Sequence, residues 1–152
     1  MASRRRAREY ALQALFQMDL TGISGDDALA SLWAGLLDPD GVGEGRPAED
    51  DEVSFASRIV VGVGKDRERL DTLIESCSTN WRLTRMPVVD RNILRMACYE
   101  LTAFDEIPGS VTINEAIELA KRFGGAESRA FVNGIVDRVA RQVGRVPEAR
   151  RG

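Results

Sequence analysis

Histidine is missing from the whole sequence of 152 residues, and cysteine occurs only twice, as Cys77 and Cys98. Without histidine there can be no Ser–His or Cys–His catalytic pair, no HExxH metal motif and no imidazole general base. The cysteines lack CxxC spacing, and no histidine is available to complete a zinc site with them. We therefore expect two ordinary thiols in a reducing cytosol, no metal, no cofactor and no catalytic residues. A mechanism built on carboxylate, lysine or tyrosine side chains would need a positive signal.

Long apolar runs are also missing. No run approaches the length of about 18 residues that a membrane span requires. The arginine-rich start is not followed by the apolar stretch of a signal peptide. The sequence therefore predicts a soluble, cytoplasmic protein with no membrane association.

Glycine is present, but not in the pattern of a nucleotide-binding loop. In the segment Gly62-Val63-Gly64-Lys65, Ile59 occupies the place of the first glycine of a phosphate loop, and Asp66 that of its Ser or Thr. We interpret this segment as a corner between two helices.

Lysine is scarce, with Lys65 and Lys121 as its only occurrences, so most of the 21 cations are arginines. The net charge of −3 hides an uneven distribution. Residues 19–56 hold ten acids and a single base, whereas residues 129–152 hold six arginines and two acids. A further cluster, which we call the arginine start, comprises Arg4, Arg5, Arg6 and Arg8.

Every long segment has the apolar spacing of a helix, and none alternates as a strand does. We predict an all-α fold of seven helices over about residues 3–20, 24–37, 51–63, 65–77, 87–104, 112–123 and 128–143. They should form one RNA-binding domain over residues 1–145, with a flexible acidic loop at 38–49 and a disordered tail at 146–152. The acidic loop is the candidate boundary between a smaller first half and a second half made of the fourth to seventh helices.

Polar residues at the expected helix ends predict the caps. Ser24 and Ser128 are placed to cap the second and seventh helices, and Thr112 with Glu115 has the spacing of a capping box for the sixth. Glu100 falls within an apolar stripe, so we expect it to be buried. Its expected role is to accept amide hydrogen bonds near Val111 and Thr112 rather than to catalyse.

Three features have both a functional and a structural interpretation. The arginine start is either a solvated end or an RNA-binding element, and cations at a helix N-terminus suggest an anionic partner because the helix dipole disfavours them there. Leu12 and Phe16 lie off the main apolar stripe of the first helix, as flanks of the core or as a partner surface. Phe131 lies off the stripe of the seventh, as a packed flank or as an exposed platform on which bases stack.

Four blocks along the chain together resemble the NusB family. These blocks are RRRAREYALQALFQ at residues 4–17, WRLTRMPVVDRNILRMACYEL at 81–101, VTINEAIELAKRFG at 111–124 and FVNGIVD at 131–137. The resemblance implies an all-α fold of two small helical subdomains. It also implies a transcription antitermination factor that binds the single-stranded boxA element of nascent ribosomal RNA transcripts together with NusE, a small-subunit ribosomal protein. That complex acts on RNA polymerase, and some members form homodimers that hide the RNA surface.

The resemblance also implies roles for individual residues. The arginine start and Phe131 correspond to RNA-binding positions, and the adjacent Arg129 joins them as a candidate. Phe16 and Asp90 correspond to positions associated with the NusE contact, with Leu12 and Arg91 beside them. The chain departs from the family at Ala130, where some members are basic, and in the length and acidity of residues 38–49.

Two other functions stay open from the sequence. Ribosomal RNA cytosine methyltransferases carry a domain similar to NusB, but no Gly-rich strand–loop–helix of a cofactor domain is present here. A homodimeric helical scaffold with incidental arginines is the other alternative.

Overall fold

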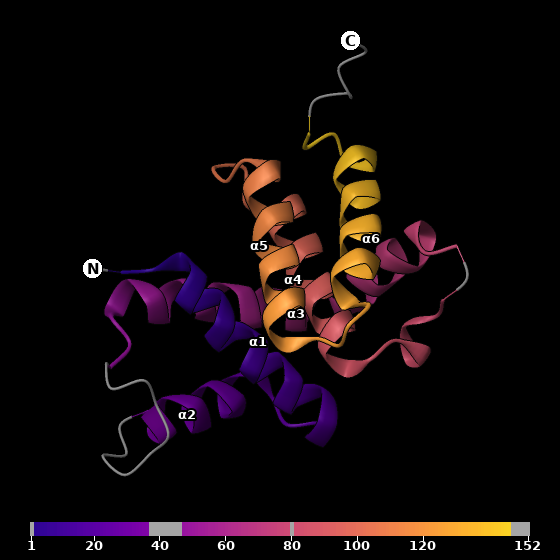
Figure 1. Cartoon of the computed structure of the whole chain (residues 1–152). Helices are drawn as coiled ribbons and strands as arrows, with labels where there is room; N and C mark the ends of the chain where they lie inside the picture. The colour runs from indigo at the N-terminus through magenta and orange to yellow at the C-terminus, as the bar shows by residue number, and fades with distance from the viewer. Residues whose placement is uncertain (1, 37–46, 80, 147–152) are drawn as a thin grey trace. The chain divides into compact units, whose positions relative to one another are not determined.

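The computed structural model describes residues 2–36, 47–79 and 81–146. Within these ranges the fold is all-α, as predicted (Figure 1). The helices are α1 (Arg4–Thr21), α2 (Gly25–Leu36), α3 (Asp50–Cys77), α4 (Val88–Ala103), α5 (Gly109–Phe123) and α6 (Ser128–Gln142), with a short 3-10 helix η1 (Leu83–Arg85) before α4. No helix among the described residues is long and apolar enough to cross a membrane.

The prediction of seven helices was wrong by one, because the third and fourth are a single helix, α3. The segment from Gly62 to Lys65 lies inside α3 and is not a corner. A glycine in a helix interior costs about 1 kcal/mol relative to alanine, whereas burying one large apolar side chain contributes about 1.5–3 kcal/mol. Val63 and Leu70 are both buried and lie two turns apart on one face, so the apolar stripe continues across the glycines.

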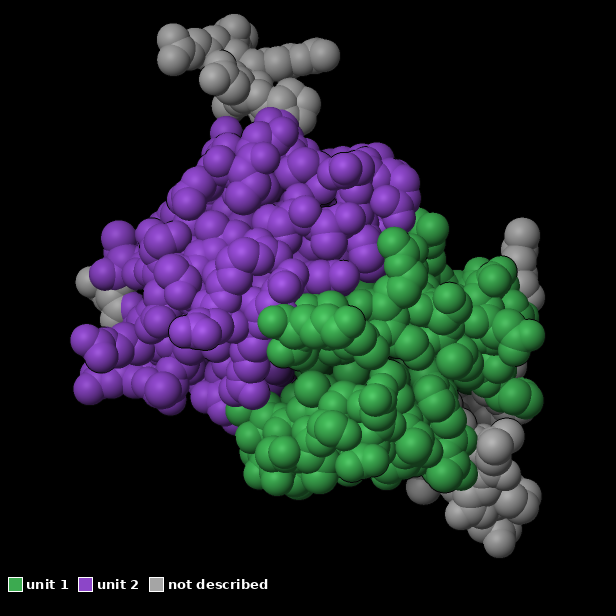
Figure 2. Space-filling model, turned by 180° about the vertical axis from the view of Figure 1, so that it is seen from behind, with its two compact units in different colours: residues 1–65 green, residues 66–152 purple. Residues whose placement is uncertain are grey.

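The chain divides into two compact units, residues 1–65 and 66–152 (Figure 2). The boundary between them falls within α3. Most of the predicted acidic loop lies outside the described residues, which leave out 37–46. The predicted tail likewise lies outside them, except for Val146.

In the first unit, α1 begins and ends close to the predicted bounds, residues 3 and 20. The Ser3 hydroxyl accepts a hydrogen bond from the Arg6 amide, and Gly22 ends the helix in the left-handed conformation, φ 75°. Ser24 caps α2 by accepting from the Asp27 amide at 3.1 Å. The buried apolar residues of this unit are Ala7, Tyr10, Ala11, Leu12, Ala14, Leu15, Ala28, Leu29, Phe55, Ala56, Ile59, Val60 and Val63.

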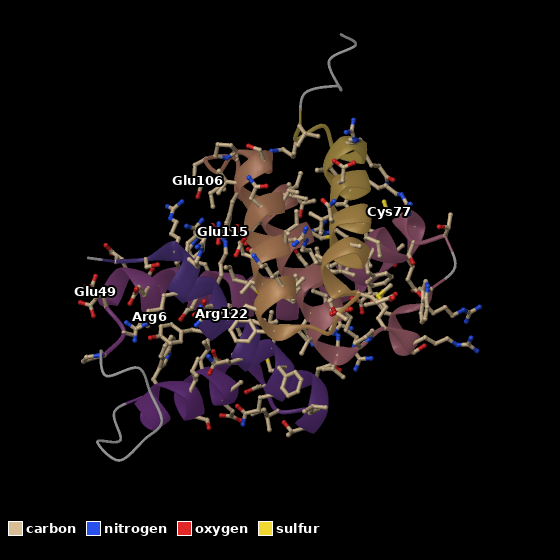
Figure 3. All side chains as sticks on the ribbon, in the orientation of Figure 1. Arg6, Glu49, Cys77, Glu106, Glu115 and Arg122 are labelled. Atoms are coloured by element: carbon tan, nitrogen blue, oxygen red, sulfur yellow. The ribbon has the colours of Figure 1, made fainter. Side chains whose placement is uncertain are left out.

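In the second unit, α4, α5 and α6 pack against one another (Figure 1). Their largest fully buried side chains include Phe104, Ile93, Leu94, Met96, Leu101 and Val132. Both cysteines are buried free thiols. Cys77, labelled in Figure 3, ends α3 and donates to the Gln142 side chain at 3.3 Å.

Two predicted caps in this unit were wrong. Helix α5 begins at Gly109, before Thr112, so the Thr112 hydroxyl lies within the helix and donates to Glu100 at 3.4 Å. Glu100 is buried, as predicted. Ser128 is the first residue of α6 rather than its cap, and its hydroxyl accepts from the Gly125 amide at 2.9 Å. Both side chains are used in contacts that their spacing in the sequence does not reveal.

Candidate nucleic-acid interface

The arginine start is fixed to α3 by a buried carboxylate, Glu52. One Glu52 oxygen accepts from the Ser3 amide at 2.9 Å, and the other accepts from the Glu49 amide at 3.0 Å. The second bond is the reciprocal half of a capping box at the start of α3. Glu52 therefore joins the segment before α1 to the first turn of α3.

The four arginines of the arginine start have different environments. The guanidinium carbons of Arg4 and Arg8 lie 4.9 and 5.3 Å from the centroid of the Phe55 ring. Arg6, labelled in Figure 3, lies 5.3 Å from the Tyr10 ring centroid. Arg8 is only 3% exposed, whereas Arg4 and Arg5 are exposed. Arg8 thus has a packing role, and the accessible charge of the cluster lies on the other three residues.

A cavity of about 410 Å³ opens between the first turns of α1 and α3. Arg4 and Arg58 bring positive charge to its lining, and Asp51 and Glu52 bring negative charge. Both charge signs are present in this cavity, so its lining has no clear preference for an anion. We therefore expect an RNA backbone to contact the exposed side chains of the arginine start rather than the inside of the cavity.

In the second unit, Phe131 is half-buried and meets Trp81 edge to face, with ring centroids 6.1 Å apart and planes at 74°. Trp81 is 49% exposed. We call these two residues the aromatic pair. They line a cavity of about 480 Å³ together with Pro87, Asp90, Glu127 and Ser128, among others.

Asp90 lies in this cavity rather than on an open helix face, and it is 3% exposed. Burial raises the pKa of the Asp90 carboxyl above its ordinary value, and a hydrogen bond with Ser128 opposes that shift. One oxygen of this carboxylate, Oδ1, is buried and has no hydrogen-bond partner among the described residues. An unpartnered buried acceptor is costly, and such groups concentrate at functional sites. The structure therefore brings together Asp90 and Phe131, to which the resemblance assigned different partners.

Two further cavities lie along α6, and one of them includes the aromatic pair. One, of about 220 Å³, shares Trp81 and Phe131 and includes Arg138, whose guanidinium also donates to the Cys77 carbonyl at 2.8 Å. The other, of about 390 Å³, includes Lys121 and Arg129. Ala130 lines both of them. Arg138 thus shares a cavity with the aromatic pair, whereas Lys121 and Arg129 line a separate cavity and no cation lines the one that contains Asp90.

The remaining predicted partner residues differ in accessibility. Leu12 is 4% exposed and belongs to the core of the first unit, while Phe16 is half-buried. Arg91 is half-buried and donates to the Leu83 carbonyl at 3.4 Å, which fixes η1 to α4. Of these three side chains, Phe16 is the one on α1 that can offer apolar surface to a partner.

Sequence reasoning missed Trp81 and Phe55. Trp81 stands in a connection, where no periodicity gives it a face, and its partner Phe131 is fifty positions away. Its position in a connection between helices, in a chain with only two tryptophans, was the available signal. Within the described ranges, no cluster of three or more carboxylate or cysteine side chains could hold a metal ion.

Comparison with known proteins gives one consistent result. The model of the NusB family matches residues 5–141. The chain is 48% identical to the transcription antitermination protein NusB of Anaeromyxobacter dehalogenans, over 100% of this chain and 99% of that protein. The structure of NusB from T. maritima is similar with a TM-score of 0.80 at 38% identity, covering 93% of this chain and 94% of the other. A crystal structure of antitermination factors NusB and NusE in complex with dsRNA has a TM-score of 0.78 at 22% identity, covering 91% of this chain and 96% of the other, a likeness of fold alone.

Proposed function

The chain belongs to the NusB family, and from this we propose that it is a transcription antitermination factor that binds RNA and catalyses no reaction. Its RNA target is the single-stranded boxA element of nascent ribosomal RNA transcripts. It binds that element together with NusE, as part of an antitermination complex on RNA polymerase in the cytoplasm. The relatives at 46–48% identity carry the name of antitermination proteins, which supports this role.

The observation that carries the proposal is the exposed part of the arginine start. Arg4 and Arg5 are exposed at the beginning of α1, where the helix dipole makes cations mildly unfavourable. Phosphate oxygens offset that cost, because guanidinium groups bind them with two parallel hydrogen bonds. The aromatic rings under Arg4 and Arg6 limit the freedom of those side chains, which reduces the entropy lost when they bind RNA.

For the protein partner we propose a contact centred on Phe16. Leu12 is buried and supports α1 from within, so it acts on this surface only through packing. Phe16→Asp should abolish NusE binding while circular dichroism still reports a folded helical protein. Leu12→Asp is the contrasting variant, and it should unfold the first unit because it places a charge in the core.

The experiment that tests the function is a titration of the full chain with a boxA-type RNA, with and without NusE. We expect binding to RNA alone that becomes tighter when NusE is present. A homodimeric scaffold would show an unchanged dimer by size-exclusion chromatography and no RNA binding. A methyltransferase-like protein would bind S-adenosylmethionine, which we expect this chain not to do.

A further inference from the structure

We propose that Glu52 is a positioning residue for RNA binding, which keeps the arginine start in its helical conformation before the RNA arrives. The inference rests on the proposed RNA-binding function and adds to it a residue that acts on the RNA only through the arginines. Glu52 is 1% exposed, so its carboxylate lies beneath the surface that an RNA could contact.

The backbone of the arginine start is held by a series of hydrogen bonds that begins at Glu52. The first turn of a helix is its weakest part, because its amides lack carbonyl partners within the helix. Here Glu52, on α3, accepts from the Ser3 amide at 2.9 Å. The Ser3 hydroxyl accepts from the Arg6 amide at 3.2 Å, and the Ser3 carbonyl accepts from the Ala7 amide at 3.0 Å. Glu52 therefore fixes Ser3, and Ser3 fixes the turn that carries the arginines.

The side chains of the same turn are held by Phe55, three residues after Glu52 on α3. The guanidinium carbons of Arg4 and Arg8 lie 4.9 and 5.3 Å from the centroid of its ring. Phe55 is 5% exposed, so the ring is itself fixed by the core of the first unit. A cation over an aromatic face is attracted to it, which limits the directions that these side chains can take. Helix α3 thus fixes the backbone through Glu52 and two side chains through Phe55.

A helix that is formed in advance changes the affinity of the arginines for RNA. Arginine-rich segments that are disordered before binding lose conformational entropy when they fold on RNA. A segment that is already ordered avoids that loss, and it binds more tightly with the same contacts. Glu52 therefore increases the affinity for RNA, although its own charge repels the phosphates.

The test is Glu52→Gln, for which charge and positioning predict opposite results. The substitution removes a negative charge beside the arginine start, which by charge alone would tighten binding of an anionic RNA. Glutamine has one acceptor oxygen and an amino group that only donates, so it cannot accept from both the Ser3 and the Glu49 amides. We expect Glu52→Gln to bind a boxA-type RNA roughly tenfold more weakly, because the turn and its side chains must then be ordered on binding. Asp51→Asn makes the same charge change at the neighbouring exposed position, and it should bind RNA at least as tightly as the unaltered protein.

Two further measurements distinguish positioning from contact. Every arginine is still present in Glu52→Gln, so the complex neutralises the same number of phosphates and the slope of log K against log salt concentration should stay unchanged. Amide hydrogen exchange without RNA reports on the first turn itself. The Ser3, Arg6 and Ala7 amides should be protected in the unaltered chain and should exchange faster in Glu52→Gln. Phe55→Leu keeps the Glu52 bonds and should also weaken RNA binding, which gives a second test if Glu52→Gln does not fold.

Three results would overturn the inference. The first is RNA binding by Glu52→Gln that is as tight as that of the unaltered protein or tighter, which would make Glu52 a purely structural residue and leave RNA binding standing. The second is an equal loss of affinity in Asp51→Asn, or a flatter salt slope in Glu52→Gln. The third is rapid exchange of the first-turn amides without RNA, since the helix would then form only on binding. An absence of RNA binding by the unaltered chain would instead overturn the proposed function itself, and this inference with it.

Discussion

Gly124 and Ser128 approach so closely that a Cβ atom on Gly124 would lie 2.5 Å from the Ser128 hydroxyl oxygen and 2.7 Å from the Ala120 carbonyl oxygen. Only glycine fits this position without movement of the backbone or of Ser128. Ser128 in turn holds Asp90 through a hydrogen bond. The turn between α5 and α6 therefore sets the position of the Asp90 carboxylate in the cavity that the aromatic pair lines.

Gly124→Ala should destabilise the protein by about 1–3 kcal/mol, the usual cost of overpacking a close contact. Gly134→Ala is the matched control, since a Cβ there meets nothing within 4 Å. That substitution lies within α6 and should stabilise the protein by about 0.5–1 kcal/mol. Urea denaturation measures both, and equal effects of the two substitutions would show that the close approach at Gly124 does not constrain the fold.

Phe131→Ala should weaken RNA binding about ten- to a hundredfold, the range for losing one stacked base. Stability should fall by less than the 3–5 kcal/mol typical of a core Phe→Ala change, because Phe131 is only half-buried. Phe104→Ala is the contrast, since Phe104 is 1% exposed and should show the full core cost. A Phe131 variant that is as unstable as the Phe104 variant, yet binds RNA normally when folded, would place Phe131 in the core and remove it from the interface.

Asp90 should make stability depend on pH. Burial raises the pKa of its carboxyl in the folded protein, so between the ordinary pKa and the raised one the folded state binds more protons than the unfolded state. Stability therefore falls as pH rises through that window, and the whole penalty is present above it. Asp90→Asn should raise the melting temperature at pH 7, with the gain disappearing below the ordinary pKa of Asp. A gain that is the same at both pH values would show that the buried charge is not its cause.

The local features of the fold were predictable because they depend on neighbours in the sequence. The bounds of α1 agree with the predicted range of residues 3–20 to within one residue, and Ser24 caps α2 as its position indicated. The burial of Glu100 followed from its place in an apolar stripe. The continuity of α3 was not predictable from the two glycines alone, because burial on both sides of them outweighs their local cost.

The site was predictable only in part, for the same physical reason. Periodicity identified Phe131 as lying off the core stripe, but it could not reveal Trp81 beside it or the cavity that they share with Asp90. The cluster of arginines was evident in the sequence, whereas the burial of Arg8 against Phe55 depends on the packing of α1 on α3. Contacts between distant segments decide which members of a recognised motif can reach a ligand.

The most direct test of the account is the salt dependence of boxA-type RNA binding by the full chain and by an Arg5→Ala, Arg6→Ala double variant. Each phosphate neutralised on a single strand contributes a slope of about −0.7 in log K against log salt concentration. We predict that the unaltered protein binds with a clearly negative slope, and that the double variant binds more weakly with a flatter slope. An identical slope for the two proteins, or no binding of the RNA by the unaltered chain, would contradict the assignment of the arginine start to RNA.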